Sequence, residues 1–309
     1  MNTYDTQTPS VDGKTIPMKM WSKDFITSER ISLCMTPNMS SNMMRFVECS
    51  EIGCNSTSKV GEFDAYTLRL GLGKCLTHLD KEDVERAPLQ VKNHKNIIPV
   101  YYDIELSDDG KIEQIGARTD EGYTFSGLIR TSVRTNKSPI LRVFRADIWN
   151  ILVQDAKSVM ESFVDWLETL TINSEKGSSK NVKIVLIAHY GVLFDHLHVV
   201  RTMLKHGIEP PDVLLSDSVV IFKMMMGKNE TAKLGVLRDK YVPWVDHVAH
   251  DADSDAGVLM ALMNVVFEVP TLIYARASVT SRKYMDLVGL NLYERTKTME
   301  QRIRDATSS

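Results

Sequence analysis

Short apolar runs and amphipathic stretches follow one another through the middle of the chain, and their periods predict its secondary structure. The run IIPVYYDIEL, which begins at Ile97, is mostly apolar and has the length of a buried strand, and the turn sequence SDDG follows it. KIEQIGAR and YTFSGLIR come next and alternate between apolar and polar positions. The pattern predicts three consecutive strands that form an antiparallel meander.

Beyond this meander the hydrophobic period becomes helical. Residues 155–170 have the spacing of an amphipathic helix, VKIVLIAH predicts a fully buried strand, and a helix over about 193–205 ends at Gly207. Two more helices are predicted over about 231–241 and 252–267. A meander, a crossover helix and a strand beside the first one predict an α/β fold, namely a ribonuclease H-like mixed sheet flanked by helices. IIPVYYDIEL is its central strand.

The same pattern divides the chain into three parts. Residues 1–95 contain short apolar stretches broken by Asn, Ser and Gly, and they predict a small β-rich region that is a candidate for binding a partner or nucleic acid. Residues 96–270 hold the α/β domain. Residues 271–309 predict a basic, helical C-terminal extension.

Composition is that of an ordinary globular protein and says little about partners. Hydrophobic residues make up 43% and charged residues 25% of the chain, and the formal net charge is −3. A protein that coats a duplex is usually more basic, whereas an enzyme that grips a few terminal nucleotides needs only a local basic patch. The sequence shows no secretory leader and no apolar run long enough to cross a bilayer. It therefore predicts an intracellular protein, cytoplasmic or nuclear, without a membrane partner.

A first pair of carboxylates lies near the end of the central strand. Asp103 and Glu105 are two residues apart, so both side chains point to one face of the sheet. Burying an unpaired carboxylate is costly, and a divalent cation would compensate these two. An Asp-x-Glu pair alone is weak, because such a pair is expected about once by chance in a chain of this length.

A second acid follows the buried strand that ends in LIAH. Asp195 lies in the first turn of the next helix, where a carboxylate interacts favourably with the helix dipole. A plain helix-capping role therefore explains Asp195 at least as well as a functional one.

A third acidic segment is HVAHDADSDAGV. His250 stands just before a predicted helix, and Asp255 lies in the opening turns of that helix. The acids between Asp246 and Asp255 exceed what capping requires, and they would repel one another unless a cation is near. A solvated acidic helix start explains the charges but not the apolar residues that dock the segment on the core.

Taken together, YYDIEL, AHYGVLFD and HDADSDA resemble the three motifs of the DEDDh branch of the DnaQ-like exonuclease superfamily. Their order fits, and so do their separations of roughly ninety and then fifty-five residues. The resemblance covers about residues 97–267. The third motif, His-x-Ala-x-x-Asp, is the most specific.

The resemblance implies a metal-dependent 3′→5′ exonuclease that releases nucleoside 5′-monophosphates. Asp103, Glu105, Asp195 and Asp255 would hold two Mg²⁺ or Mn²⁺ ions about 4 Å apart, and His250 would act as general base. His247 is a rival base, but it lies outside the family spacing and has no partner comparable with the Ala252 that accompanies His250. The partner would be nucleic acid with a free 3′ end. The sequence does not discriminate between DNA and RNA.

Substrate contacts are predicted beside the motifs. Tyr190 stands where the family usually has Asn, and Leu106 follows the first motif in place of a small residue, so both are candidates to contact the terminal nucleotide. Phe125 is a third, weaker candidate. Arg130 and Arg134 begin a basic stretch that could contact the phosphate backbone, although a solvated loop explains it equally well.

The cysteines all lie in the first quarter of the chain. Cys49 and Cys54 with Cys34, Cys75 and His78 offer a structural zinc site. No Cys-x-x-Cys pair is present, so plain core cysteines are the preferred interpretation.

An alternative to the exonuclease is a catalytically inert ribonuclease H-like protein that binds nucleic acid or acts as a scaffold. A degenerate scaffold should have lost at least one of the five catalytic positions, and all five are filled here. The sequence decides neither on protein partners nor on a homodimer.

Overall fold

A six-stranded mixed sheet forms the centre of the computed structural model. The structure describes residues 46–48, 57–59, 81–87, 89–132, 153–173, 182–226, 233–288 and 290. The strands of the sheet are β3 (Ile97–Leu106), β4 (Ile112–Thr119), β5 (Thr124–Leu128), β6 (Lys183–Ala188), β7 (Leu214–Asp217) and β8 (Val279–Thr280).

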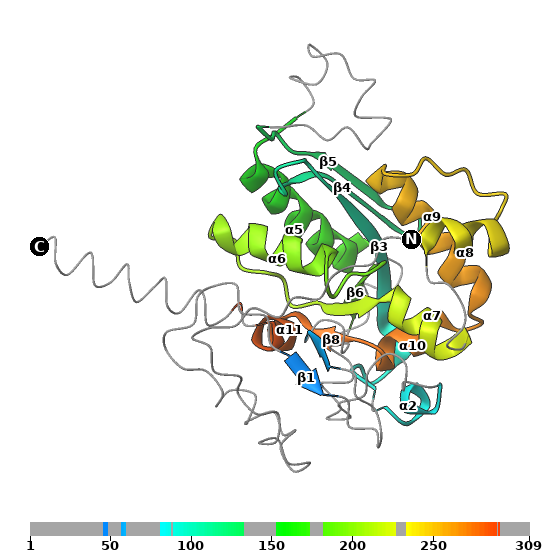
Figure 1. Ribbon diagram of the computed structural model, residues 1–309. Helices are drawn as coiled ribbons and strands as arrows, with labels where there is room; N and C mark the ends of the chain where they lie inside the picture. Colours follow the sequence, from blue (N-terminus) through cyan, green and yellow to red (C-terminus); the bar gives the residue numbers. More distant parts are fainter. Residues whose placement is uncertain are drawn as a thin grey trace, which may run out of the picture. The chain divides into compact units, whose positions relative to one another are not determined.

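The order of the strands is β5-β4-β3-β6-β7-β8. β3, β4 and β5 form the expected antiparallel meander, β6 and β7 run parallel to β3, and β8 is antiparallel to β7. The chain is thus α/β, with a mixed sheet whose central strand is β3 (Figure 1). Asp103 and Glu105 lie on this strand. This order is compatible with the predicted ribonuclease H-like fold.

Helices cover both faces of the sheet (Figure 1). They are α5 (Ala156–Asn173), α6 (Asp195–Lys205), α7 (Ser218–Met226), α8 (Leu234–Tyr241), α9 (Ala252–Val266), α10 (Pro270–Arg276) and α11 (Ser281–Leu287), with α2 (Lys81–Arg86) and the 3₁₀ turn η2 (His94–Asn96) before β3. The predicted helices before Pro270 are confirmed to within a few residues.

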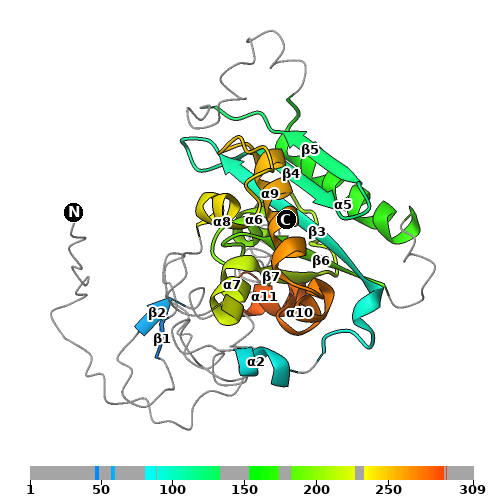
Figure 2. The ribbon, with the colours of Figure 1, turned by 90° about the vertical axis from the view of Figure 1, so that its right-hand side faces the viewer.

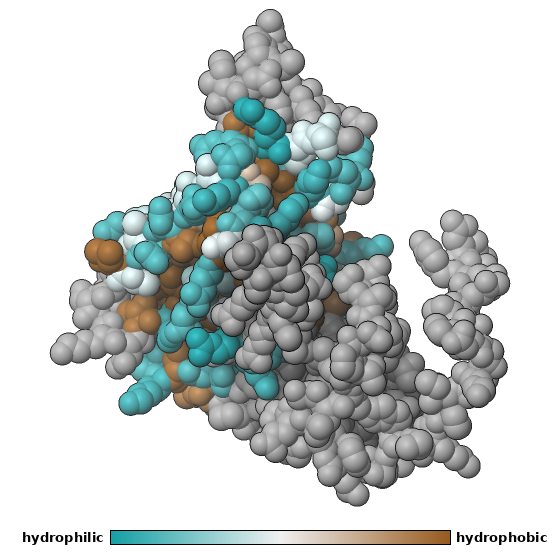
Figure 3. Space-filling view, turned by 90° about the vertical axis from the view of Figure 1, so that its left-hand side faces the viewer, coloured by the Kyte–Doolittle hydropathy of each residue, from teal (hydrophilic) through white to brown (hydrophobic). Residues whose placement is uncertain are grey.

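The core has two parts, one on each face of the sheet. On one face Phe163 of α5 and Val199 of α6 pack against β3, β4 and β6. Hydrophilic side chains predominate on the described outer surface of that side, with separate apolar areas between them (Figure 3). On the other face Leu237 and Leu259 belong to a second cluster with β6 and β7. Seen from this second side, α9 crosses over β3 and β4 (Figure 2).

Three elements were missed in the sequence. β7 and α7 follow one another without a break inside the apolar run VLLSDSVVIF, and β8 joins the sheet from the segment predicted as a helical extension. In the predicted β-rich region the structure describes one short hairpin, β1 (Phe46–Glu48) antiparallel to β2 (Thr57–Lys59), besides α2 and the turn before β3. The remainder of that region lies outside the described residues.

No helix in the described segments has by itself both the length and the apolar composition needed to span a bilayer. The successive helices α9 and α10 meet these criteria only as a pair, and they are bent by 103° at their junction.

Candidate metal centre and active site

The start of α9 lies directly on β4, opposite the acidic pair of β3. Asp103 is paired in register with Gly116 of β4, and a Cβ added to Gly116 would stand 2.5 Å from the carbonyl carbon of Ala252. Only a residue without a side chain permits this approach. Ala252 is fully buried in the contact. Gly116 and Ala252 therefore bring the first turn of α9 to the strand that carries Asp103.

A glutamine anchors the same helix terminus. Gln114 of β4 donates from Nε2 to Asp251 Oδ1 (2.9 Å) and accepts from the Ala252 amide at Oε1 (3.3 Å). Asp251 is also the N-cap of α9, because its side chain accepts the amide of Ser254 (3.1 Å). Gln114 was not predicted from the sequence, where its only signal was a polar side chain at a strand position that faces the core.

Three of the predicted ligands converge at this point. Asp103, Glu105 and Asp255 each offer a carboxylate oxygen, and these oxygens lie within 4.8 Å of one another. Glu105 and Asp255 are each only 9% exposed. Burial, followed by the charges of Asp195 and Asp255, raises the pKa of Asp103 well above its usual range. So close a set of buried acids is stable in the charged form only beside a cation.

Asp195 adds a fourth carboxylate beside these three. It is the first residue of α6, is 1% exposed, and accepts the amide of Ile104 at Oδ1 (3.1 Å). Its Oδ2 has no hydrogen-bond partner among the described residues. Burial raises the pKa of Asp195 well above its usual range, against the lowering effect of its backbone hydrogen bonds. Leaving a buried oxygen unpartnered is costly, so a ligand at Oδ2 would remove a penalty.

His250 lies at the open edge of the cluster. Its backbone is left-handed (φ 63°), and its amide donates to Asp255 Oδ2 (3.2 Å). Its side chain is 59% exposed, and Nδ1 lies 3.9 Å from Glu105 Oε1. The ring is thus accessible to solvent and adjacent to a candidate metal ligand, which is what a general base for an attacking water requires.

His247 does have a partner, contrary to the expectation from sequence. Its Nε2 lies 2.6 Å from Asp255 Oδ1, and its side chain is only 14% exposed. Burial raises the pKa of Asp255, while the hydrogen bond from His247 lowers it. The expectation failed because spacing along a helix does not restrict a loop residue, and His247 lies in the loop before α9.

The loop of the second motif is fixed from several sides. Tyr190 is left-handed (φ 69°), and Gly191 leaves no room for a side chain because a Cβ there would lie 2.6 Å from His196 Nε2. Asp217 at the end of β7 accepts the amide of Val192 (3.1 Å), and burial raises the pKa of Asp217 to about 6. Tyr284 donates to the Val192 carbonyl (2.6 Å). Asp217 is a further residue that the sequence analysis missed.

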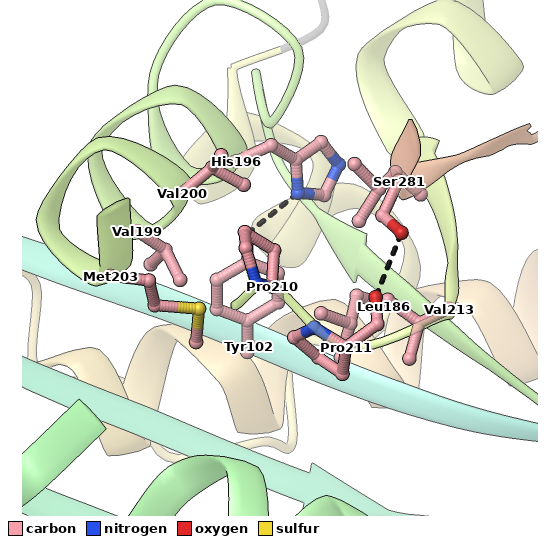
Figure 4. A pocket seen from close by; sticks show the side chains of 11 residues that line it. Tyr102, Leu186, His196, Val199, Val200, Met203, Pro210, Pro211, Val213 and Ser281 are labelled. Atoms are coloured by element: carbon pink, nitrogen blue, oxygen red, sulfur yellow. Dashed lines mark hydrogen bonds between the residues drawn. The ribbon is translucent and has the colours of Figure 1, made fainter. Parts of the chain in front are cut away.

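His196 has a structural role. Tyr102 donates to its Nδ1 (2.6 Å), its Nε2 donates to the Ser216 carbonyl (3.0 Å), and burial lowers the pKa of His196 to about 4. Figure 4 shows His196 and Tyr102 beside Val199, Met203 and the prolines that line a small hollow. The hollow has a volume of about 10 Å³, which admits one water molecule at most. It is a packing void and not a substrate site.

The predicted substrate residues are only partly placed near the acids. Tyr190 is 46% exposed at the end of β6, and Leu106 follows Glu105 but packs partly on the core. Arg130 is exposed after β5, whereas Arg134 lies outside the described residues. The expectation for Phe125 is wrong, since its ring packs on Phe163 and Trp166 of α5 with centroids 5.1 and 5.7 Å away. The cysteines proposed for zinc, Cys34, Cys49, Cys54 and Cys75, also lie outside the described residues.

A search against models of protein families and a search of curated proteins both find no match to the chain. The resemblance to DEDDh exonucleases therefore rests on the three motifs and on the arrangement of their residues.

Proposed function

We propose that the chain is a metal-dependent 3′→5′ exonuclease of the DEDDh type with a ribonuclease H-like fold. The observation that carries the proposal is the convergence of Asp103, Glu105 and Asp255 from two distant segments, with their oxygens within 4.8 Å of one another. His250 beside Glu105 supports the same proposal. A structural role explains any one of these side chains, but not three largely buried acids whose oxygens lie this close together.

The topology supports the fold assignment. An antiparallel meander continued by two parallel strands on the far side of the first strand is the order expected of a ribonuclease H-like sheet, and β5-β4-β3-β6-β7 has this order. The candidate ligands come from β3, α6 and α9, that is, from the central strand and from helices on both faces.

The residues fit a pair of oxygen-bound divalent cations, Mg²⁺ or Mn²⁺. Asp103, Glu105 and Asp255 would hold one cation. Asp103 would hold the other together with Asp195 Oδ2, which has no hydrogen-bond partner within the described part of the chain. Such ions supply Lewis acidity that activates water and stabilises a leaving 3′ oxygen. A site without a cation would leave the repulsion between these acids uncompensated.

His250 would accept the proton of the attacking water. A neutral imidazole nitrogen can accept a proton from water, and this ring is accessible to solvent at the edge of the acids. Leu106 and Tyr190 are proposed to contact the last nucleotide, and Arg130 and Arg134 the phosphate backbone. The phosphodiester bond breaks between phosphorus and the 3′ oxygen, and the phosphate leaves on the released 5′-monophosphate.

The test uses labelled single-stranded DNA and RNA, each with a free or a blocked 3′ end, in Mg²⁺, Mn²⁺ or EDTA. We expect stepwise shortening from free 3′ ends only, and none in EDTA. His250→Ala should lower the rate by at least about 10²-fold, the contribution typical of a general base. Asp103→Ala removes a proposed metal ligand and should lower the rate at least as much. Asp246→Asn is the matched control, because Asp246 is an exposed acid of the same segment.

Two results would refute the proposal. Shortening that survives Asp103→Ala would mean that the acids are not the catalytic centre. Cuts inside a strand with a blocked 3′ end would mean that the reaction is not exonucleolytic. Binding of oligonucleotides without any shortening would instead favour the inert ribonuclease H-like scaffold.

A further inference from the structure

His247 contacts Asp255 of the candidate metal centre, but it is neither a proposed metal ligand nor the proposed general base. We propose that His247 is a positioning residue that holds Asp255 in its metal-binding orientation and thereby determines how tightly the site binds a divalent cation. The proposal rests on the proposed function in one respect only, which is that Asp255 is a cation ligand. It does not require that the reaction be nucleic-acid hydrolysis.

The contact fixes the carboxylate of Asp255 at both oxygens. His247 donates from Nε2 to Oδ1 (2.6 Å), and the amide of His250 donates to Oδ2 (3.2 Å). A carboxylate offers about four acceptor positions, so each oxygen keeps one for a cation. Rotation of the carboxylate would break both hydrogen bonds. Asp255 is therefore held in one orientation before any cation arrives.

The loop that carries His247 is itself anchored on both sides. Before it, Arg238 donates from Nε (2.9 Å) and Nη2 (2.8 Å) to the carbonyl of Val245. After it, the amide of Val248 donates to Ser254 Oγ (2.8 Å) in the first turn of α9. A loop held at both ends leaves the imidazole little freedom, which agrees with its 14% exposure. The orientation of Asp255 thus depends on a rigid support.

The same geometry argues against His247 as the general base. Its Nε2 is engaged by Asp255 in a nearly buried contact, whereas the ring of His250 is 59% exposed. A base must reach the proton of the attacking water, directly or through one more water. Loss of His247 should consequently weaken cation binding and leave turnover at saturating cation almost unchanged. Loss of His250, the proposed base, should lower turnover at saturating cation and leave cation binding almost unchanged.

The experiment measures Mn²⁺ affinity of the full chain by calorimetry and by Mn²⁺-dependent thermal shift, and the rate of oligonucleotide shortening as a function of Mn²⁺. In His247→Ala we expect Mn²⁺ affinity to fall about 10–100-fold, as for other groups that orient metal ligands. His247→Gln keeps an N–H donor and should recover most of the affinity. His247→Phe fills the same space without a donor and should behave like His247→Ala, which separates the hydrogen bond from packing.

His94→Ala is the matched control. His94 is also half-buried and shares a hydrogen bond with a side chain, Thr271 Oγ1 (3.1 Å), but it lies before β3, at the end of the strand away from the acids. Its loss should leave Mn²⁺ affinity unchanged.

The inference is overturned if His247→Ala binds Mn²⁺ as tightly as the wild type, or more tightly. It is also overturned if turnover is lost at saturating Mn²⁺ while the affinity stays the same, because His247 would then be the base. The two proposals fail separately. A wild type that binds Mn²⁺ and shortens no oligonucleotide contradicts the exonuclease, yet a fall of affinity in His247→Ala would still support the role of His247.

Discussion

Replacement of Asp103 by asparagine should make the protein more stable in the absence of metal. The oxygens of Asp103, Glu105 and Asp255 lie within 4.8 Å of one another. At an effective dielectric constant of about 20, two unit charges at this distance repel by about 3.5 kcal/mol. Asp103 takes part in two such pairs, and an amide in its place carries no charge. In the metal-free protein, the repulsion between these acids therefore lowers the free energy of unfolding.

The net gain should be smaller than this repulsion. Burial and the neighbouring charges raise the pKa of Asp103, so the wild type already relieves part of the repulsion by keeping a proton. We expect Asp103→Asn to raise the free energy of unfolding in EDTA at pH 7.5 by about 1–3 kcal/mol. This corresponds to about 3–8 °C in Tm for a domain of this size.

In the presence of cations the wild type should be more stable than Asp103→Asn, the reverse of the order expected in EDTA. Mn²⁺ at one hundred times its Kd would stabilise the wild type by about 2.7 kcal/mol, whereas Asp103→Asn lacks a ligand and should gain far less. Thermal melting in EDTA and in Mn²⁺ measures both effects. Asp246→Asn is the control, since the loss of an exposed acid should change stability by less than about 0.5 kcal/mol.

Either of two outcomes would contradict this prediction. One is that Asp103→Asn melts at a lower temperature than the wild type in EDTA, which would mean that Asp103 stabilises the apo fold. The other is that Mn²⁺ raises the Tm of both proteins equally, which would place the cation elsewhere.

Three further predictions concern the support of the site. Gly116→Ala should destabilise the fold by about 1–3 kcal/mol in urea unfolding, because its Cβ would collide with α9, whereas Gly235→Ala in α8 meets open space and should be neutral or stabilising. Tyr190→Asn should raise the free energy of unfolding by about 0.5–1 kcal/mol, because asparagine tolerates the left-handed backbone better, and Tyr190→Phe should not. Burial raises the pKa of Asp217 to about 6, so between about pH 4 and 6 the folded state binds a proton that the unfolded state has released. Stability from this group should fall as pH rises through that window, and the fall should be smaller in Asp217→Asn.

The central strand and its acids were predictable because they depend on local patterns. A strand places alternate residues on one face, so Asp103 and Glu105 point to the same face of the sheet whatever the position of the strand in it. Asp195 and Asp255 lie in the first turns of helices, as predicted, because the period of each apolar stripe located the helix start.

Elements inside continuous apolar runs were not predictable in the same way. VLLSDSVVIF contains β7 and the start of α7, and only the polar triplet Ser216-Asp217-Ser218 separates the apolar residues on either side of the boundary. The boundary is made by Asp217, whose Oδ1 accepts the amide of Val219 (2.9 Å) as a helix cap does. This short polar triplet between two apolar stretches was the available signal in the sequence.

The contacts of Gln114 with Asp251 and of Asp195 with the Ile104 amide join residues far apart in the sequence, and no local pattern predicts them. Among the described residues, Tyr190 and His250 are the non-glycine residues with a left-handed backbone, a conformation unfavourable for bulky side chains. Each belongs to a segment held by a buried carboxylate, Asp217 for the loop of Tyr190 and Asp255 for the amide of His250. Because the same carboxylate of Asp255 is a candidate ligand, the conformation of the proposed base and the geometry of the metal centre depend on one side chain. Backbone strain of this kind persists only where surrounding contacts enforce it, and the hydrogen bonds accepted by Asp217 and Asp255 are such contacts.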